Sequence, residues 1–419
     1  MHKDGATVHS STTQEVSFFD LSRQTAEVRD EVVAALARVC DSGQFVLGPE
    51  CERLETSLAD YCRVPHAVAC ASGSDALLLA LMASGVTSGD EVILPSFTFF
   101  ATAGAVWRLG ARPVFVDIDD ESFNIDPAQI EACISSRTRA IIAVHLYGQC
   151  ADMDAIVEIA RRHKLVVIED AAQAIGAELG GRRAGAMGDI GCFSFYPSKN
   201  LGGFGDGGLL TAADDEVANR LRKLRVHGES QRYHHELVGF NSRLDAFQAA
   251  VLNVKLPHLE TWTAQRRAHA ERYAALFAGA NLTDVVGLPR ELPDRRHVWN
   301  QYVVRVSPAE RDELRKHLAA EGVGTQVYYP VPLHQQPCFQ ALLSGPLPET
   351  ERAAAETLAL PVFPEMREDE QRYVVASVAR FFNQRSGIPI GEGLRGPKFL
   401  KARSTESHRP GGSDARAAA

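Results

Sequence analysis

The segment between residues 66 and 170 alternates short apolar runs with helical patterns, and this alternation constrains the fold more than any other feature of the chain. The apolar runs are rich in valine, isoleucine and leucine without a polar face, so each strand must be buried on both sides. Such strands are typical of a parallel or mostly parallel sheet covered by helices on both faces. We therefore predict strands at residues 67–70, 91–96, 113–119, 140–146 and 165–170, and helices that start near Asp75 and span 101–110 and 152–163.

The pattern changes near residue 255, where apolar residues recur at helical spacing to about residue 275. This long helix is expected to lead into a second, smaller domain with strands at 301–307 and 324–330 and helices at 311–322 and 367–382. We predict a large domain over residues 17–260 and a small C-terminal α/β domain over residues 261–385. The two ends, residues 1–16 and 386–419, show no apolar period and are predicted to be disordered.

Charge and composition exclude several classes of protein. The net charge of −9 would repel a phosphate backbone, so we expect no nucleic acid partner. No apolar run approaches the ~18 residues of a membrane span, and the N-terminus lacks the apolar region of a signal peptide. We therefore expect a cytoplasmic protein without a membrane partner. The eight cysteines never form a C-x-x-C pair, which predicts reduced, mostly buried thiols and no metal site.

Three features could carry chemistry, and each also has a simple structural explanation. Asp170 ends a predicted strand, where ligands bind in sheets of this kind, but it would equally serve as the N-cap of a following helix. Lys199 lies between an aromatic run and Gly202-Gly203, where a lysine is commonly a surface residue with a buried stem. Residues 71–75, ASGSD, form a small-residue turn that could hold an anion at a helix start, although many such turns bind nothing.

Pyridoxal phosphate is the one cofactor that needs all three features together. An unprotonated lysine amine must lie beside it to hold the aldehyde. A carboxylate must face the pyridine nitrogen to keep that nitrogen protonated, so that the ring withdraws electrons. A turn of free N–H groups must anchor its phosphate. The sequence supplies the three groups as Lys199, Asp170 and the 71–75 turn.

Residues 203–208, GFGDGG, match the G-x-G-x-x-G pattern of dinucleotide-binding proteins. That pattern requires a helix to open at the glycines. Here the following residues, LLTA, indicate a strand instead, so we do not expect a nicotinamide site.

The chain resembles the sugar aminotransferases of the DegT/DnrJ/EryC1/StrS family, which have the type I fold of aspartate aminotransferase. The resemblance runs in order from about residue 17 to residue 382, and thus covers nearly everything except the tails. Nine segments carry it: ASGSDALLLAL, PSFTFFAT, VHLYGQCADMDAI, VIEDAAQAIGA, FSFYPSKNLGGFGDGG, LRVHGE, NSRLDAFQAAVL, VYYPVPLH and LALPVFPEM. It implies an α/β type I PLP-dependent transferase with a mostly parallel central sheet and a smaller C-terminal α/β domain.

The resemblance also implies roles for single residues. Lys199 matches the Schiff-base lysine, which then acts as general acid and base, and Asp170 matches the partner of the pyridinium nitrogen. Other positions match cofactor contacts: Gln173 near the phenolic oxygen, Phe99 stacked on the ring, and Gly73, Ser74, Asp75 and Ser194 around the phosphate. Asn241 matches an asparagine that reaches the phosphate from the neighbouring subunit, which implies a homodimer with shared active sites.

The implied reaction transfers an amino group from glutamate to a nucleotide-linked keto-sugar. Some relatives dehydrate deoxysugars instead, but in those histidine replaces the lysine; a non-catalytic regulatory homologue is a third alternative. The motifs resemble the members that aminate C3 of a hexose. Many of those have His-Tyr-Pro where this chain has Tyr328-Tyr329-Pro330, which favours a neutral deoxy-keto-hexose over a sugar acid. The expected substrate residues are Arg243, Tyr328, Tyr329, His334 and His227, although a lone histidine is more commonly structural.

Overall fold

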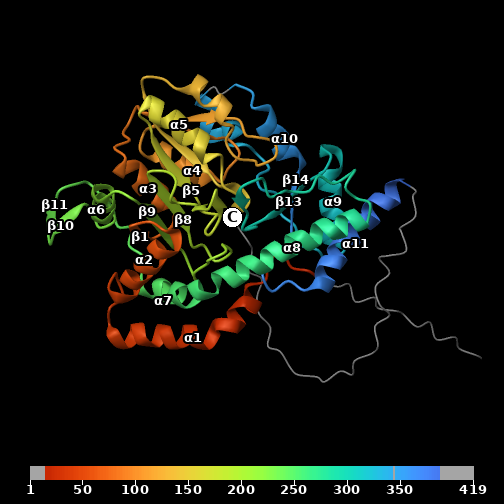
Figure 1. Ribbon diagram of the computed structural model, residues 1–419, viewed down its shortest axis with the longest axis horizontal. Helices are drawn as coiled ribbons and strands as arrows, with labels where there is room; N and C mark the ends of the chain where they lie inside the picture. The colour runs from red at the N-terminus through yellow and green to blue at the C-terminus, as the bar shows by residue number, and fades with distance from the viewer. Residues whose placement is uncertain (1–14, 343–344, 387–419) are drawn as a thin grey trace, which may run out of the picture.

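The computed structural model describes residues 15–342 and 345–386, and a seven-stranded sheet forms its centre (Figure 1). The strand order is β1-β9-β8-β5-β4-β2-β3. Six strands run in the same direction, whereas β9 is antiparallel to both of its neighbours, so the sheet is mostly parallel as predicted. The strand bounds are β1 His66–Cys70, β2 Glu91–Pro95, β3 Arg112–Val116, β4 Thr138–Val144, β5 Val166–Asp170, β8 Ile190–Ser194 and β9 Gly208–Ala212.

Helices cover both faces of this sheet. One face packs against α3 (Gly73–Ala83), α4 (Phe100–Arg108) and α6 (Asp215–Leu224). The other face packs against α2 (Pro49–Cys62), α5 (Met153–His163) and α7 (Ala246–Lys255). The first long helix, α1 (Leu21–Ser42), packs on α7 rather than on the sheet. The strands are therefore apolar on both sides because each side meets a layer of helices.

The predicted helix at 152–163 shows how local sequence sets these elements. Asp152 is its N-cap, and its carboxylate accepts the N–H of Ala155 at 3.3 Å. Ile156, Ile159 and Ala160 form the buried face. The helix ends at His163 because Lys164 adopts a left-handed conformation.

A separate hydrophobic core lies in the C-terminal part of the chain. It joins α8 (Leu259–Gly279), α9 (Pro308–Ala320) and α11 (Glu368–Ser386) to a two-stranded sheet of β13 (Tyr302–Arg305) and β14 (Thr357–Leu360). Two short sheets accompany these elements: a three-stranded sheet of β6 (Glu178–Leu179), β7 (Arg182–Arg183) and β12 (Arg295–Arg296), and a hairpin of β10 (Glu229–Gln231) and β11 (His234–His235) that projects beyond α6. A last short helix, α10, spans Pro348–Glu356. The two cores are consistent with the predicted domains, whose bounds remain a prediction.

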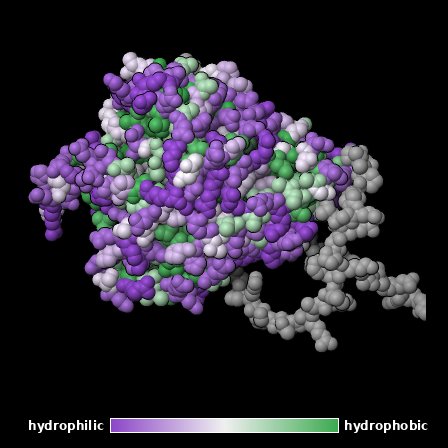
Figure 2. All heavy atoms as spheres, viewed as in Figure 1, coloured by the Kyte–Doolittle hydropathy of each residue, from purple (hydrophilic) through white to green (hydrophobic). Residues whose placement is uncertain are grey.

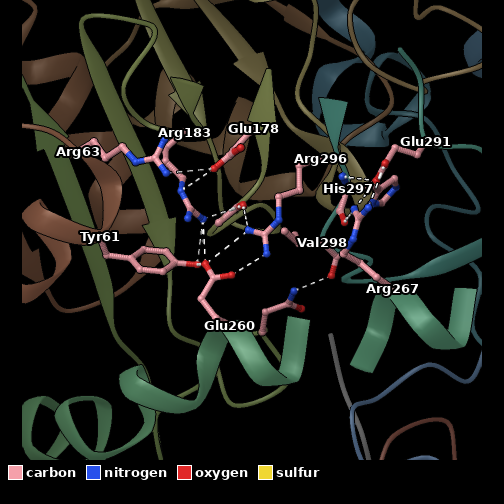
Figure 3. A network of polar contacts seen from close by, with 12 residues as sticks. Tyr61, Arg63, Glu178, Arg183, Glu260, Arg267, Glu291, Arg296, His297 and Val298 are labelled. Carbon is pink, nitrogen blue, oxygen red and sulfur yellow. Dashed lines mark hydrogen bonds and ion pairs between the residues drawn. The ribbon is translucent and has the colours of Figure 1, made fainter. Parts of the chain in front are cut away.

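Helix α8 lies between the two cores and is fixed to the large one by ion pairs (Figure 3). The Glu260 carboxylate accepts from the Tyr61 hydroxyl at 2.8 Å, from Arg183 at 3.1 Å and from Arg296 at 2.6 Å. These partners come from α2, β7 and β12. One glutamate near the start of α8 therefore joins three segments that are far apart in the sequence.

Two predictions about elements were wrong in detail. No strand forms at 324–330; Gln326 makes a single bridge to Ala359, and β14 pairs with β13 instead. Pro330, the last residue of that segment, has no N–H to donate to a neighbouring strand. The helix predicted from residue 255 begins at Leu259, after a 3₁₀ turn that contains Pro257.

The N-terminal tail was predicted to extend to residue 16, but Val16 is ordered. Val16 is 1% exposed and forms a β-bridge with Val323. Its N–H donates a hydrogen bond to the carbonyl of Gly322. Residues 1–14 and 387–419, on which the other predictions of disorder fall, lie outside the described residues.

The visible surface is mostly hydrophilic, with hydrophobic residues in small separate areas (Figure 2). Within residues 15–342 and 345–386, no helix combines the length and the hydropathy that crossing a bilayer requires.

Candidate active site

The carboxyl ends of β4, β5 and β8 bring the first two candidate residues together. Asp170 is the last residue of β5 and pairs in register with Cys192 of β8, and the turn after β8 carries Lys199. The amine of Lys199 and the carboxylate of Asp170 are close enough to interact electrostatically. This edge is where ligands bind in open α/β sheets.

Asp170 is 5% exposed, and its carboxylate accepts two hydrogen bonds. The Thr102 hydroxyl donates to Oδ2 at 2.8 Å, and the N–H of Ala172 donates to Oδ1 at 3.3 Å. Burial raises the pKa of Asp170, and these bonds and the charge of Lys199 only partly oppose the rise. A buried carboxylate of this kind is stabilised by a cationic partner, as a protonated pyridine nitrogen would be.

The residue before Asp170 anchors the end of β5. Glu169 is fully buried; its carboxylate accepts from His145 Nε2 at 2.8 Å and from the N–H groups of Gly185, Met187 and Gly188 at 2.6–2.8 Å. Burial alone would raise the pKa of Glu169, but these bonds lower it overall. Strand β5 therefore ends in a fixed position, which in turn fixes Asp170.

Lys199 is half-buried, and its Nζ makes no hydrogen bond or ion pair within residues 15–342 and 345–386. Burial lowers the pKa of its amine to about 8, although the charge of Asp170 acts in the opposite direction. An amine with this pKa is partly unprotonated near neutral pH. It can therefore act as a nucleophile or a base, which an ordinary surface lysine cannot do efficiently.

The small-residue turn forms the N-terminus of α3, as predicted. Ser72 is the N-cap and accepts the N–H of Asp75 at 3.1 Å. Gly73 packs against Ser194 at the end of β8; a Cβ on Gly73 would lie 2.7 Å from the Cβ of Ser194. Gly73, Ser74 and Ser194 thus share one end of the sheet with Asp170, and the start of α3 offers free N–H groups to an anion.

The Asp75 side chain, at the predicted phosphate turn, forms a hydrogen bond with Ser242. Its Oδ2 accepts the hydroxyl of Ser242 at 2.7 Å, and the Ser242 carbonyl accepts the N–H of Ala71 at 3.2 Å. Asp75 therefore attaches the segment around Ser242 to the turn. The neighbours of Ser242 are Asn241 and Arg243, which are exposed and half-buried, respectively.

Gln173 and the Tyr328-Tyr329 pair meet on one side of Asp170. The Gln173 Oε1 accepts the N–H of Tyr147 at 2.7 Å, and its Nε2 donates to the Tyr329 hydroxyl at 3.2 Å. The Tyr147 hydroxyl in turn donates to the Tyr328 carbonyl. Burial raises the pKa of Tyr329, so its hydroxyl stays protonated. The ring of Phe99, which is 45% exposed, lies 6.2 Å from that of Tyr329.

The two candidate histidines differ in their surroundings. His334 is held inside the protein: Nδ1 is 2.7 Å from the Ser96 hydroxyl and Nε2 is 3.3 Å from Glu351. His227 is exposed, and its N–H donates to the carbonyl of Phe240. The preceding residue, Val226, forms a β-bridge with Asn241, so His227 lies beside the Asn241 segment. His334 thus docks its own segment onto the end of β2, whereas His227 belongs with the Asn241 segment.

Sequence reasoning missed several residues that hold this site together. Thr102, His145 and Ser242 have no distinctive local pattern and act on partners 24 to 167 positions away. Ser72 did have a signal, because Ser72-Gly73-Ser74-Asp75 matches the S-x-x-D start of a capping box.

The sheet order, the smaller C-terminal core and the residues at the strand ends define a type I PLP-dependent transferase fold. The chain belongs to the DegT/DnrJ/EryC1/StrS aminotransferase family, which it matches over residues 26–379.

The sequence similarity to individual relatives covers almost the whole length of those proteins. A pleiotropic regulatory protein of Geobacillus stearothermophilus is 52% identical over 369 residues, 88% of this chain and 98% of that protein. A UDP-N-acetyl-3-dehydro-alpha-D-glucosamine 3-aminotransferase of Acidithiobacillus ferrooxidans is 46% identical over 87% of this chain and 97% of that protein.

Solved structures of the same fold include complexes. The crystal structure of Streptomyces venezuelae DesV in complex with a ketimine intermediate has a TM-score of 0.84 at 47% identity, covering 88% of this chain and 99% of the other. NtdA of Bacillus subtilis, with bound PMP, has a TM-score of 0.84 at 34% identity, covering 90% and 87%.

Proposed function

We propose that this protein is a PLP-dependent aminotransferase that moves an amino group from glutamate to a nucleotide-linked keto-sugar. The observation that carries the proposal is the amine of Lys199, which is half-buried beside Asp170 and has no hydrogen-bond or ion-pair partner within the described residues. Membership of an aminotransferase family and the PMP in NtdA support it.

The residues present fit pyridoxal phosphate. Asp170, whose pKa is raised by burial, would face the pyridine nitrogen. The start of α3 with Gly73 and Ser74, together with Ser194, would hold the phosphate. The Phe99 ring would stack on the cofactor ring, and Gln173 would lie near its phenolic oxygen. When bound, the cofactor supplies an electron sink that stabilises negative charge on the amino-bearing carbon.

Lys199 would do two tasks at this site. Its amine would hold the cofactor. It would also serve as the group that moves a proton at the amino-bearing carbon and at C4′, a role that suits an amine with a pKa of about 8. Asp170 would keep the pyridine nitrogen protonated.

The substrate residues form a second part of the proposal. Tyr328 and Tyr329 lie beside Gln173, and Arg243, which is half-buried, provides a positive charge suited to a diphosphate. His227 would contribute from the Asn241 segment, and His334 would act by docking its own segment. The 3-aminotransferase name of the Acidithiobacillus relative supports amination at C3.

A homodimer with shared active sites is also proposed. Asn241 is exposed in the single chain, which would leave its amide free to reach the phosphate of a neighbouring subunit. The test mixes Lys199→Ala chains with Asn241→Asp chains under subunit exchange. If the sites are shared, each mixed dimer contains one active site that carries neither substitution, and activity returns. Confirmed subunit exchange without restored activity would contradict the role of Asn241.

A regulatory role is the second candidate, because the Geobacillus relative is named as a regulatory protein. One experiment separates the two: the purified protein is incubated with PLP, glutamate and a panel of dTDP- and UDP-linked keto-sugars, and NMR locates the new C–N bond. A yellow protein that aminates one sugar at C3 supports the proposal. A colourless protein, or one that aminates none of the panel, contradicts it.

A further inference from the structure

The turn that carries Lys199 is fixed to the rest of the protein by its neighbours, not by Lys199 itself. The turn leaves the sheet after Ser194 and returns at Gly208. Its base is closed by two backbone hydrogen bonds of 2.8 Å, from Phe195 to Gly207 and from Gly203 to Phe195. Between these ends, the position of the lysine depends on what its flanking residues bind.

Asn200, the residue directly after Lys199, is 4% exposed and has both ends of its amide bonded. Its Nδ2 donates to the carbonyl of Val298 at 2.9 Å, and its Oδ1 accepts from Asn300 Nδ2 at 2.8 Å. An amide held at both ends has one orientation, so the backbone of Asn200 is fixed on the side toward residues 298–300.

The 298–300 segment is itself rigidly held. The N–H groups of Val298 and Asn300 donate to Gly148 and Tyr147 at 2.9 and 3.0 Å. On the other side, the buried Arg266 of α8 donates to the carbonyl of Trp299 at 3.1 Å. Figure 3 shows Val298 next to His297, whose carbonyl accepts from Arg267 of the same helix. Asn200 therefore ties the lysine turn to a segment fixed to both α8 and the end of β4.

Helix α7 holds the other side of the turn. Lys255 is 3% exposed, and its Nζ donates to the carbonyl of Gly202 at 2.5 Å. The rings of Phe204 and Trp262 lie 5.9 and 5.7 Å from this amine. Two turns of helix away on the same face, Gln248 accepts the N–H of Phe204 at 2.8 Å.

Burying the lysine ammonium group in this environment costs desolvation free energy, which packing of the side chain alone would not justify. Its surroundings are aromatic, and burial lowers the pKa of its amine to about 8. An apolar side chain of similar length would pack there without that cost. The hydrogen bond to Gly202 indicates a structural role for the amine, because the backbone of Gly202 packs closely against Pro197. A Cβ at position 202 would lie 2.2 Å from the carbonyl oxygen of Pro197.

We propose that Asn200 and Lys255 are positioning residues that clamp the turn from two sides and so hold the Lys199 amine in one orientation toward Asp170. Neither residue is among those proposed above to bind substrate or cofactor. The inference rests on the proposed function only for the reaction that Lys199 serves, since the surroundings of the amine can be probed by labelling without turnover.

The test compares Asn200→Ala and Lys255→Met with the wild type, and Asn253→Ala is the matched control. Asn253 also lies on α7, but its amide donates to Glu50 instead of to the turn. The first readout is the pH dependence of Lys199 labelling by an amine reagent in the apoprotein. The second is the separation of kcat from KM for both substrates.

A loosened turn lets water reach the Lys199 amine. We expect both clamp variants to move the labelling midpoint of Lys199 upward toward the ordinary lysine value, and to lower kcat at least tenfold with KM changed less than threefold. Lys255→Arg, which keeps a donor, should restore part of kcat. The control should match the wild type in both readouts.

An unchanged labelling midpoint together with a kcat within twofold of the wild type would overturn the proposal. If Asn200→Ala fails to fold, Asn300→Ala removes only the outer partner of the same amide and is judged by the same criteria. If the wild type transfers no amino group but the midpoint still moves in the clamp variants, the clamp stands and the proposed function fails.

Discussion

The unusual acidity of Lys199 gives the most informative prediction about the isolated protein. A pKa of about 8 leaves about a quarter of the amine neutral at pH 7.5, against about 0.1% for a lysine with the ordinary value of 10.5. Lys199 should therefore react with a trace of acetic anhydride roughly two hundred times faster than an unperturbed lysine of equal accessibility at that pH.

The perturbation is Asp170→Asn, which removes the one charge that raises the pKa of Lys199. Burial then acts without opposition, so the midpoint should fall below that of the wild type. The assay is competitive labelling of the apoprotein over pH 6–11, with mass spectrometry of the Lys199 peptide. Lys316 is the internal reference, because it is exposed and its pKa is raised by Glu313. A wild-type midpoint near 10.5, or a rise in the variant, would refute the reasoning.

Three further predictions concern single residues. In the cofactor-loaded enzyme, Asp170→Asn should keep the fold and the cofactor but lose several orders of magnitude in turnover, and near-normal turnover would show that Asp170 has only a structural role. Gly73→Ala should weaken PLP binding about five- to a hundredfold in a spectroscopic titration, since its Cβ would overlap Ser194 at a cost of about 1–3 kcal/mol; unchanged affinity would show that this turn does not hold the phosphate. His334→Ala should lower the melting temperature by several degrees, because it breaks buried contacts to Ser96 and Glu351; a loss of kcat at an unchanged melting temperature would instead assign His334 to the substrate.

The fold was largely readable from the sequence because its strongest signals are local. Continuous apolar strands can only be covered on both faces, and the pattern at 140–170 therefore predicted both the parallel pairing of β4 with β5 and the position of Asp170 at the carboxyl end of β5. At 324–330 the composition favoured a strand, but the structure forms only the bridge between Gln326 and Ala359, and Pro330 at the end of the segment has no N–H to donate.

The supporting contacts of the site could not be predicted in the same way. The Thr102 bond to Asp170 spans 68 positions, and the Ser96 contact with His334 spans 238. Nothing in the local sequence distinguishes these residues from other small polar side chains. Lys255 shows the limit most clearly: the sequence placed it at the start of the long helix, whereas it is the last residue of α7, and its burial against Gly202 depends on how the lysine turn folds back.

The most direct test of the account is to find which lysine binds the cofactor. The protein is loaded with PLP, reduced with borohydride, digested and analysed by mass spectrometry, with Lys199→Ala treated in parallel. The account predicts one pyridoxyl group on the Lys199 peptide, none in the variant, and loss of transamination in the variant. A reduced pyridoxyl group on another lysine, including the buried Lys255, or a fully active Lys199→Ala enzyme, would contradict it.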